Sequence, residues 1–136
     1  MKVTVDANIL FSALIKEGLT RKIWFNPELE LFSPKFLFSE FQKYANYLNK
    51  KSRLNKTEFE LLSDKLFSQI RIVEDQELTP FLPAAASLST DSKDWLYIAL
   101  ALKENTIIWS EDKDLKIQQR LTVYSTQEMQ KEFGQL

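Results

Sequence analysis

Because this 136-residue chain contains neither cysteine nor histidine, any catalysis must come from carboxylates, lysine, tyrosine, serine or a metal held by oxygen ligands. The absence of cysteine excludes disulfides, thiolate nucleophiles and zinc–thiolate sites. The absence of histidine excludes a Ser-His-Asp triad and imidazole ligands for zinc or copper. Oxygen ligands alone select hard cations such as Mg²⁺ or Mn²⁺. Carboxylate-held metal chemistry, such as phosphodiester hydrolysis, is therefore the activity to look for.

Two aspartates follow predicted strands. Asp6 ends the alternating segment 2–6, and Asp112 lies just beyond the apolar segment 106–109. Ligands of an open parallel sheet bind at the carboxyl ends of the strands, where the strand order reverses, so the two acids could meet there. The alternative is structural, with Asp6 capping the next helix and Asp112 occupying an ordinary turn.

Glu40 lies on the apolar face of a predicted helix, residues 34–48, between Tyr44 and Tyr47 on the helical wheel. We expect this arc to be buried, together with residues 36, 37, 38, 41, 45 and 48. A lone buried carboxylate costs several kcal/mol unless it is paired, protonated or bound to a cation. Lys43 or a tyrosine hydroxyl is the alternative partner.

Asp94 repeats this anomaly on a predicted helix at residues 91–105, where it lies between Ile98 and Ala101 on the apolar face. Asp91 shares that side of the helix. Both could instead serve the helix start, with Asp91 as the N-cap and Asp94 facing the first free N–H groups.

The elements that position these acids alternate between strands and helices. We expect strands at residues 2–6, 30–32, 70–73, 106–109 and 121–124, and helices at residues 8–16, 21–25, 34–48, 56–68, 91–105, 111–120 and from 126. Ser33 and Pro34 are expected to begin the third helix as N-cap and N1. A proline-punctuated connection is expected around residues 80–83. This alternation predicts an α/β fold with a parallel sheet covered on both faces.

Length and charge add context. The chain is expected to form a single domain, residues 1–136, and to be cytoplasmic with no membrane segment, because it shows neither a signal peptide nor a long apolar run. Its net charge is −1, but residues 49–72 carry +3 and residues 73–112 carry −6. A basic surface beside an acidic cluster suits a polyanion substrate and a metal site, although chance variation on solvated helices is the alternative.

Four segments together resemble the ordered motifs of PIN domains, including VapC-like ribonuclease toxins. They are residues 5–10 (VDANIL), 39–40 (SE), 94–101 (DWLYIALA) and 109–115 (WSEDKDL). The resemblance spans nearly the whole chain. It implies a three-layer α/β/α sandwich around a central parallel sheet and an endoribonuclease that depends on Mg²⁺ or Mn²⁺.

By matching positions, the resemblance implies that Asp6, Glu40, Asp94 and Asp112 form the catalytic, metal-binding quartet. The supporting residues it implies are Asn8, Ser110, Asp91 and Asp114, the last replacing or assisting Asp112. The first candidates for phosphate contacts are Lys50, Lys51, Arg53 and Lys56. The partners implied are an RNA substrate, an antitoxin protein and a second copy of the chain.

Two alternatives stay open. One is a non-catalytic PIN-like module that binds RNA or an antitoxin, in which the acids hold a structural cation or a partner's arginine. The other is a haloacid-dehalogenase-like phosphatase, which also begins with an aspartate after its first strand. That family has a second aspartate two residues later, whereas this chain has Asn8, an amide that cannot titrate.

Overall fold

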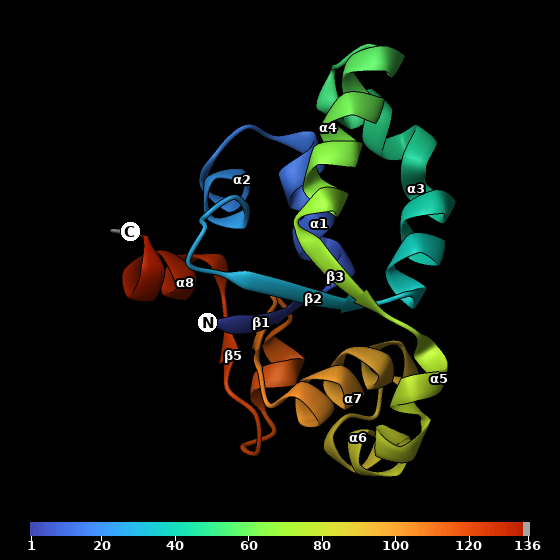
Figure 1. The fold of residues 1–136 in the computed structure, drawn as a ribbon, viewed down its shortest axis with the longest axis vertical. Helices are drawn as coiled ribbons and strands as arrows, with labels where there is room; N and C mark the ends of the chain where they lie inside the picture. Colours follow the sequence, from blue (N-terminus) through green and yellow to red (C-terminus); the bar gives the residue numbers. More distant parts are fainter. Residues whose placement is uncertain (135–136) are drawn as a thin grey trace.

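The computed structural model describes residues 1–134, which are arranged around a five-stranded sheet in the order β3-β2-β1-β4-β5 (Figure 1). The strands are β1 (Lys2–Val5), β2 (Glu30–Pro34), β3 (Ile70–Val73), β4 (Ile107–Trp109) and β5 (Val123–Tyr124). All neighbouring strands are parallel. The order runs outward from β1 on one side and from β4 on the other. The point of reversal therefore lies between β1 and β4, where ligands of such sheets bind.

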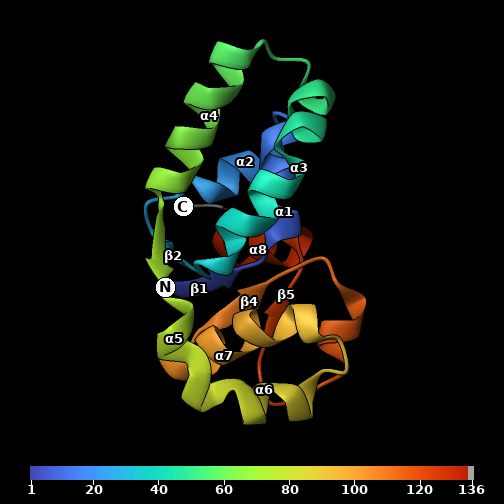
Figure 2. The same ribbon diagram turned by 90° about the vertical axis from the view of Figure 1, so that its right-hand side faces the viewer.

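Helices cover both faces of the sheet, which confirms the predicted α/β/α sandwich (Figures 1 and 2). One face carries α1 (Ala7–Ile15), α2 (Leu19–Trp24), α3 (Phe36–Ser52), α4 (Lys56–Ser68) and α8 (Thr126–Phe133). The other carries α5 (Asp75–Leu78), α6 (Leu82–Leu88) and α7 (Trp95–Glu104). Three 3₁₀ turns complete the described elements: η1 (Thr79–Phe81), η2 (Ser92–Asp94) and η3 (Lys113–Lys116). Within residues 1–134, no helix has the length and apolar character needed to cross a bilayer.

The core is divided in two by the sheet, because alternate strand residues point to opposite faces. Val5 packs on the face covered by α1, and Phe32 packs on the face covered by α7. On the α1 side the buried rings of Trp24 and Trp109 lie 6.1 Å apart, and Trp24 Nε1 donates to the carbonyl of Leu66 at 2.9 Å. Each such large side chain contributes about 1.5–3 kcal/mol through burial. These contacts fix α2 against β4 and α4, while backbone pairing holds β1 beside β4.

The start of the third helix differs from the prediction. Ser33 and Pro34 end β2 instead of opening α3, because the Ser33 hydroxyl donates across the sheet to the Val5 carbonyl at 3.0 Å. The helix begins at Phe36, whose N–H donates to Asp75 Oδ1 at 3.2 Å. A side chain 39 residues away therefore takes the place of the expected N-cap.

Two further segments differ. Residues 111–120 form only the short turn η3 instead of a helix, because Leu115 is the one buried residue of that segment and no apolar stripe supports a longer helix. The proline-punctuated connection is helical, as η1 and α6. Pro80 and Pro83 lie in the first turns of these elements, where a missing N–H costs nothing.

Candidate functional site

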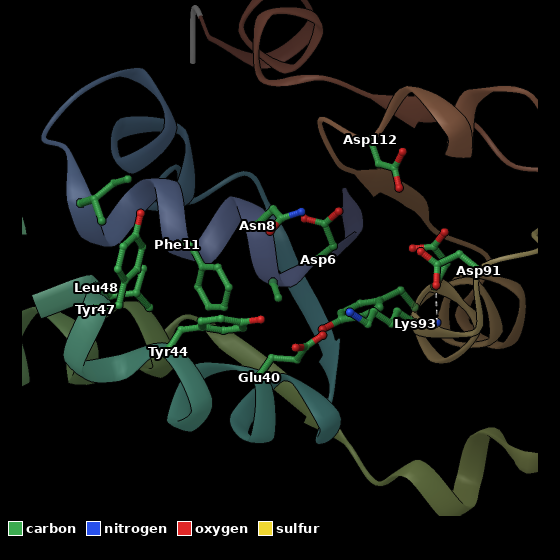
Figure 3. Close-up of a pocket in the computed structure, with 14 residues that line it drawn as sticks. Asp6, Asn8, Phe11, Glu40, Tyr44, Tyr47, Leu48, Asp91, Lys93 and Asp112 are labelled. Atoms are coloured by element: carbon green, nitrogen blue, oxygen red, sulfur yellow. Dashed lines mark hydrogen bonds between the residues drawn. The ribbon is translucent and has the colours of Figure 1, made fainter. Parts of the chain in front are cut away.

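A cavity of about 400 Å³ lies where β1 and β4 end, and its wall includes side chains from both faces of the sheet (Figure 3). All four carboxylates singled out in the sequence line it. Asp6 follows β1, Glu40 lies on α3, Asp94 closes η2, and Asp112 follows β4. The topology thus brings together four acids from segments that are far apart in the chain.

Asp6 is the most buried of these acids, with 8% of its surface exposed. Its Oδ1 accepts a hydrogen bond from Ile9 N at 3.1 Å, so it caps α1 while also lining the cavity. The pKa of the Asp6 carboxyl is raised to about 6, mainly by burial and also by the charges of Asp94 and Asp112, while hydrogen bonds from Ser110 and Ile9 N partly offset the rise. The cap and the site are therefore the same side chain.

Asp94 lies in the 3₁₀ turn that precedes α7, and not within one continuous helix as predicted. Ser89 Oγ donates a hydrogen bond to Asp94 Oδ2 at 3.0 Å, and Trp95 Nε1 donates one to the Ser89 carbonyl oxygen at 2.9 Å. Burial raises the pKa of Asp94, and Asp112 and Asp91 add to this effect. Asp91 caps η2 by accepting from Lys93 N at 3.0 Å, and both residues also line the cavity.

The turn after β4 carries two candidate acids, Asp112 and Asp114, which differ in their position relative to the cavity. Ser110 is fully buried, and its Oγ accepts from Asp112 N at 3.0 Å. Asp112 Oδ1 in turn accepts from Asp114 N at 2.9 Å. Asp112 lines the cavity, whereas Asp114 lies outside its wall. On the opposite side of the turn, Asn8 presents an exposed amide to the cavity.

The face of α3 that carries Glu40 is only partly buried, which corrects the expected buried arc. Leu48 is buried, but Tyr44 and Tyr47 are 37% and 58% exposed. Figure 3 shows these tyrosines at the end of the cavity opposite Asp91, with Glu40 between the two ends. Glu40 therefore faces the cavity, and this face of α3 forms one of its walls, while Leu37 and Leu48 of the same helix pack in the core.

Tyr97 was not singled out in the sequence. It lines the cavity, is 4% exposed, and its hydroxyl has no hydrogen-bond partner among residues 1–134. Burial raises the pKa of the Tyr97 hydroxyl and the nearby carboxylates of Glu40 and Asp6 add to this effect, while the backbone N–H of Ala7, which lies near the hydroxyl, partly offsets it. Its position three residues after Asp94, on the same side of the helix, is the sequence signal that could have identified it. Ser89 and Lys93 lacked such a signal.

The donor set suits a hard divalent cation. All the acidic ligands are oxygens, burial and mutual repulsion raise the pKa of Asp6 and Asp94, and the Tyr97 hydroxyl lacks a partner. A cation would relieve this excess of negative charge. In the described part of the chain, no three carboxylates converge closely enough to hold an ion as they stand. Binding would therefore draw the side chains inward.

The predicted basic residues lie away from the cavity. Lys50, Lys51, Arg53 and Lys56 belong to the end of α3, its connection to α4 and the start of α4, and none of them lines the cavity wall. Lys56 lines a separate hollow between these two helices. Lys51 alone approaches the site, with its Nζ 5.8 Å from the ring centre of Tyr47.

Two solved structures resemble the fold. PAE2754 from Pyrobaculum aerophilum matches with a TM-score of 0.73 and 15% identity, over 100% of this chain and 91% of its own. A chain of VapBC2 from Rickettsia felis, solved bound to a DNA fragment from their promoter, matches with a TM-score of 0.69 and 17% identity, over 92% of this chain and 98% of its own. A search of curated proteins finds no match.

At these identities the two structures establish the fold alone. The sequence itself gives the family, since the model that describes the PIN domain matches residues 4–134, which include both strand-end aspartates and the helices between them. With nearly its whole length matched in this way, the chain belongs to the PIN domain family.

Proposed function

We propose that this chain, as a single PIN domain over residues 1–136, is a divalent-metal-dependent endoribonuclease that hydrolyses phosphodiester bonds in the acidic cavity. One observation carries the proposal: four carboxylates from four separate segments line one cavity beside an unpartnered tyrosine hydroxyl. PIN domains are in general nucleases, which supports hydrolysis as the reaction class. Because the chain has no histidine and no cysteine, the carboxylates are the metal ligands that remain for this chemistry.

The carboxylates of Asp6, Glu40, Asp94 and Asp112 would hold Mg²⁺ or Mn²⁺. When bound, such an ion polarises the phosphodiester and lowers the pKa of the attacking water. The Ser89 hydroxyl orients the Asp94 carboxylate by donating a hydrogen bond to it.

Asn8 and Ser110 have supporting roles. The exposed amide of Asn8 is placed to donate to a phosphate oxygen or an ordered water. Ser110 Oγ accepts from Asp112 N and so fixes the turn that carries that acid. Asp91 supports the site as the cap of η2.

The substrate and partners are proposed with it. RNA is the substrate, and the likeness to a chain of VapBC2 supports the proposal that this chain is the toxin of a toxin–antitoxin pair. Its partners would then be an antitoxin protein and a second copy of the chain.

A cleavage assay tests the proposal. Single-stranded RNA is incubated with purified protein in Mn²⁺ or in EDTA, using wild type, Asp94→Asn and a control, Asp64→Asn, whose side chain is exposed on α4 outside the cavity. We expect cleavage by wild type and Asp64→Asn in Mn²⁺ only, and a loss of about 100- to 1000-fold in Asp94→Asn. Equal cleavage by Asp94→Asn would identify a contaminant. Metal-insensitive RNA binding without cleavage would favour the non-catalytic module.

A further inference from the structure

The cavity has a second end that metal chemistry does not explain. Figure 3 shows the apolar and aromatic side chains of Phe11, Tyr44, Tyr47 and Leu48 at the end away from Asp91 and Asp112, and Ile15 also lines the cavity. We propose that this aromatic end is a stacking subsite for a nucleobase, so that the substrate enters as a single strand with an unstacked base. The inference rests on the proposed function, because it takes the substrate of the acidic end to be a nucleic acid.

Helix α3 connects the two ends. Glu40, Tyr44 and Tyr47 follow one another at helical spacing, so they project from the same face of α3 into the same cavity. At 1.5 Å per residue, Glu40 and Tyr47 are about 10 Å apart along the helix axis, the rise of about three stacked nucleotides. A strand whose phosphodiester lies among the carboxylates would therefore bring a base a few nucleotides along the strand to the tyrosines.

The rings are held in place but leave surface exposed. Phe11 packs edge-on against Tyr44, with ring centres 5.6 Å apart and planes at 67°. Leu48 is buried behind them, whereas Tyr44 and Tyr47 keep 37% and 58% of their surfaces exposed. Exposed aromatic side chains on a helix are the kind of platform on which bases stack in single-strand-binding proteins, without requiring a given sequence.

Positive charge surrounds the rings and complements a nucleic acid backbone. Lys43 Nζ lies 5.4 Å from the ring centre of Tyr44, and Lys51 Nζ lies 5.8 Å from that of Tyr47. Neither lysine forms an ion pair within residues 1–134. A cavity of about 400 Å³ accepts a ligand of nucleotide size. A duplex, whose bases remain stacked inside it, would reach the lysines but not the rings.

Binding measured in a cleavage-deficient background tests the subsite. The full chain carrying Asp94→Asn is titrated in EDTA with a fluorescein-labelled RNA of mixed sequence that is long enough to form a stable duplex with its complement, and the anisotropy gives Kd with and without the annealed complementary strand. We expect tighter binding of the single strand, a loss of about 5- to 10-fold with Tyr47→Ala, and retention with Tyr47→Phe, because one exposed stack contributes at the low end of the known range. Phe25→Ala, which removes a 37% exposed aromatic side chain outside this cavity, is the control and should not change Kd.

Three results would overturn the inference. The first is an unchanged affinity of Tyr47→Ala for the single strand, the second is a loss of affinity in Tyr47→Phe as large as that in Tyr47→Ala, and the third is duplex binding as tight as single-strand binding. An unchanged affinity would assign the rings to a protein partner instead. Cleavage by the wild type in Mn²⁺ is scored separately. If the wild type does not cleave RNA but the affinity for the single strand still depends on Tyr47, the proposed catalysis is refuted and the subsite is not. If the wild type cleaves RNA but the affinity does not depend on Tyr47, only the subsite is refuted.

Discussion

Replacing Asp6 by asparagine isolates the electrostatic strain of the cavity from the packing around it. Asparagine has nearly the shape of aspartate and caps helices equally well, so the hydrogen bond from Ile9 N to residue 6 should persist. What the substitution removes is the charge of a carboxylate that is 8% exposed and close to Asp94 and Asp112.

The magnitude follows from the pKa of Asp6, which rises from an ordinary 3.8 to about 6 on folding. The folded state binds the Asp6 proton more tightly than the unfolded state does. Protonation of Asp6 therefore stabilises the fold fully below pH 3.8, and this stabilisation is lost as the pH rises through about 6. At about 1.36 kcal/mol per tenfold change, the ionised carboxylate costs the folded state about 3 kcal/mol at pH 8. Asp6→Asn should therefore exceed wild type in stability by up to about 3 kcal/mol at pH 8.

Urea unfolding in EDTA, followed by tryptophan fluorescence from pH 4 to pH 8, measures this difference directly. The advantage of Asp6→Asn in the free energy of unfolding should be small at pH 4 and grow with pH to about 3 kcal/mol, which corresponds to about 10 °C in Tm in a thermal melt. Asp64→Asn, which alters an exposed aspartate on α4, should follow the wild type throughout. If Asp6→Asn is less stable at pH 8, or if its advantage does not change with pH, the reasoning about buried charge is refuted.

Three further predictions concern side chains around the cavity and the sheet. Tyr97→Phe should raise the free energy of unfolding, measured with urea in EDTA, by about 1 kcal/mol, because it removes a buried hydroxyl without a partner. A lower free energy of unfolding would show that the hydroxyl does form a hydrogen bond. Ser89→Ala should lower Mn²⁺-dependent cleavage by about 10-fold, since Asp94 loses the group that orients it; an unchanged kcat would contradict this role. Thr4→Val should cost about 1–3 kcal/mol by leaving Thr106 unpaired, and a second change, Thr106→Val, should restore most of that in a double-mutant cycle, whereas additive losses would contradict the pairing.

Local signals explain why much of the fold could be predicted from the sequence. The predicted bounds 56–68 and 70–73 coincide with α4 and β3. Asn55 and Glu58 form a capping box at the start of α4, and three of the four residues of β3, Ile70, Ile72 and Val73, are β-branched and apolar. The meeting of Asp6 and Asp112 follows from the parallel order of β1 and β4, which alternating strands and helices already imply.

What could not be predicted depends on partners far away in the chain. The start of α3 is set by Asp75 and by a Ser33 bond to the neighbouring strand, neither of which local spacing can reveal. A helical wheel identified the apolar arc of α3 but not that Tyr44 and Tyr47 face an open cavity. The roles of the quartet and of the basic residues stay predictions.

Equilibrium binding of Mn²⁺, measured by titration calorimetry on the full chain, tests most directly whether the carboxylates form a cation site. We predict saturable binding by the wild type and by Asp64→Asn, and its loss in the double variant Asp6→Asn/Asp94→Asn, which removes two of the charges that line the cavity. Equal binding by that variant, or no binding by a folded wild type, would contradict the claim that the cavity holds a divalent cation.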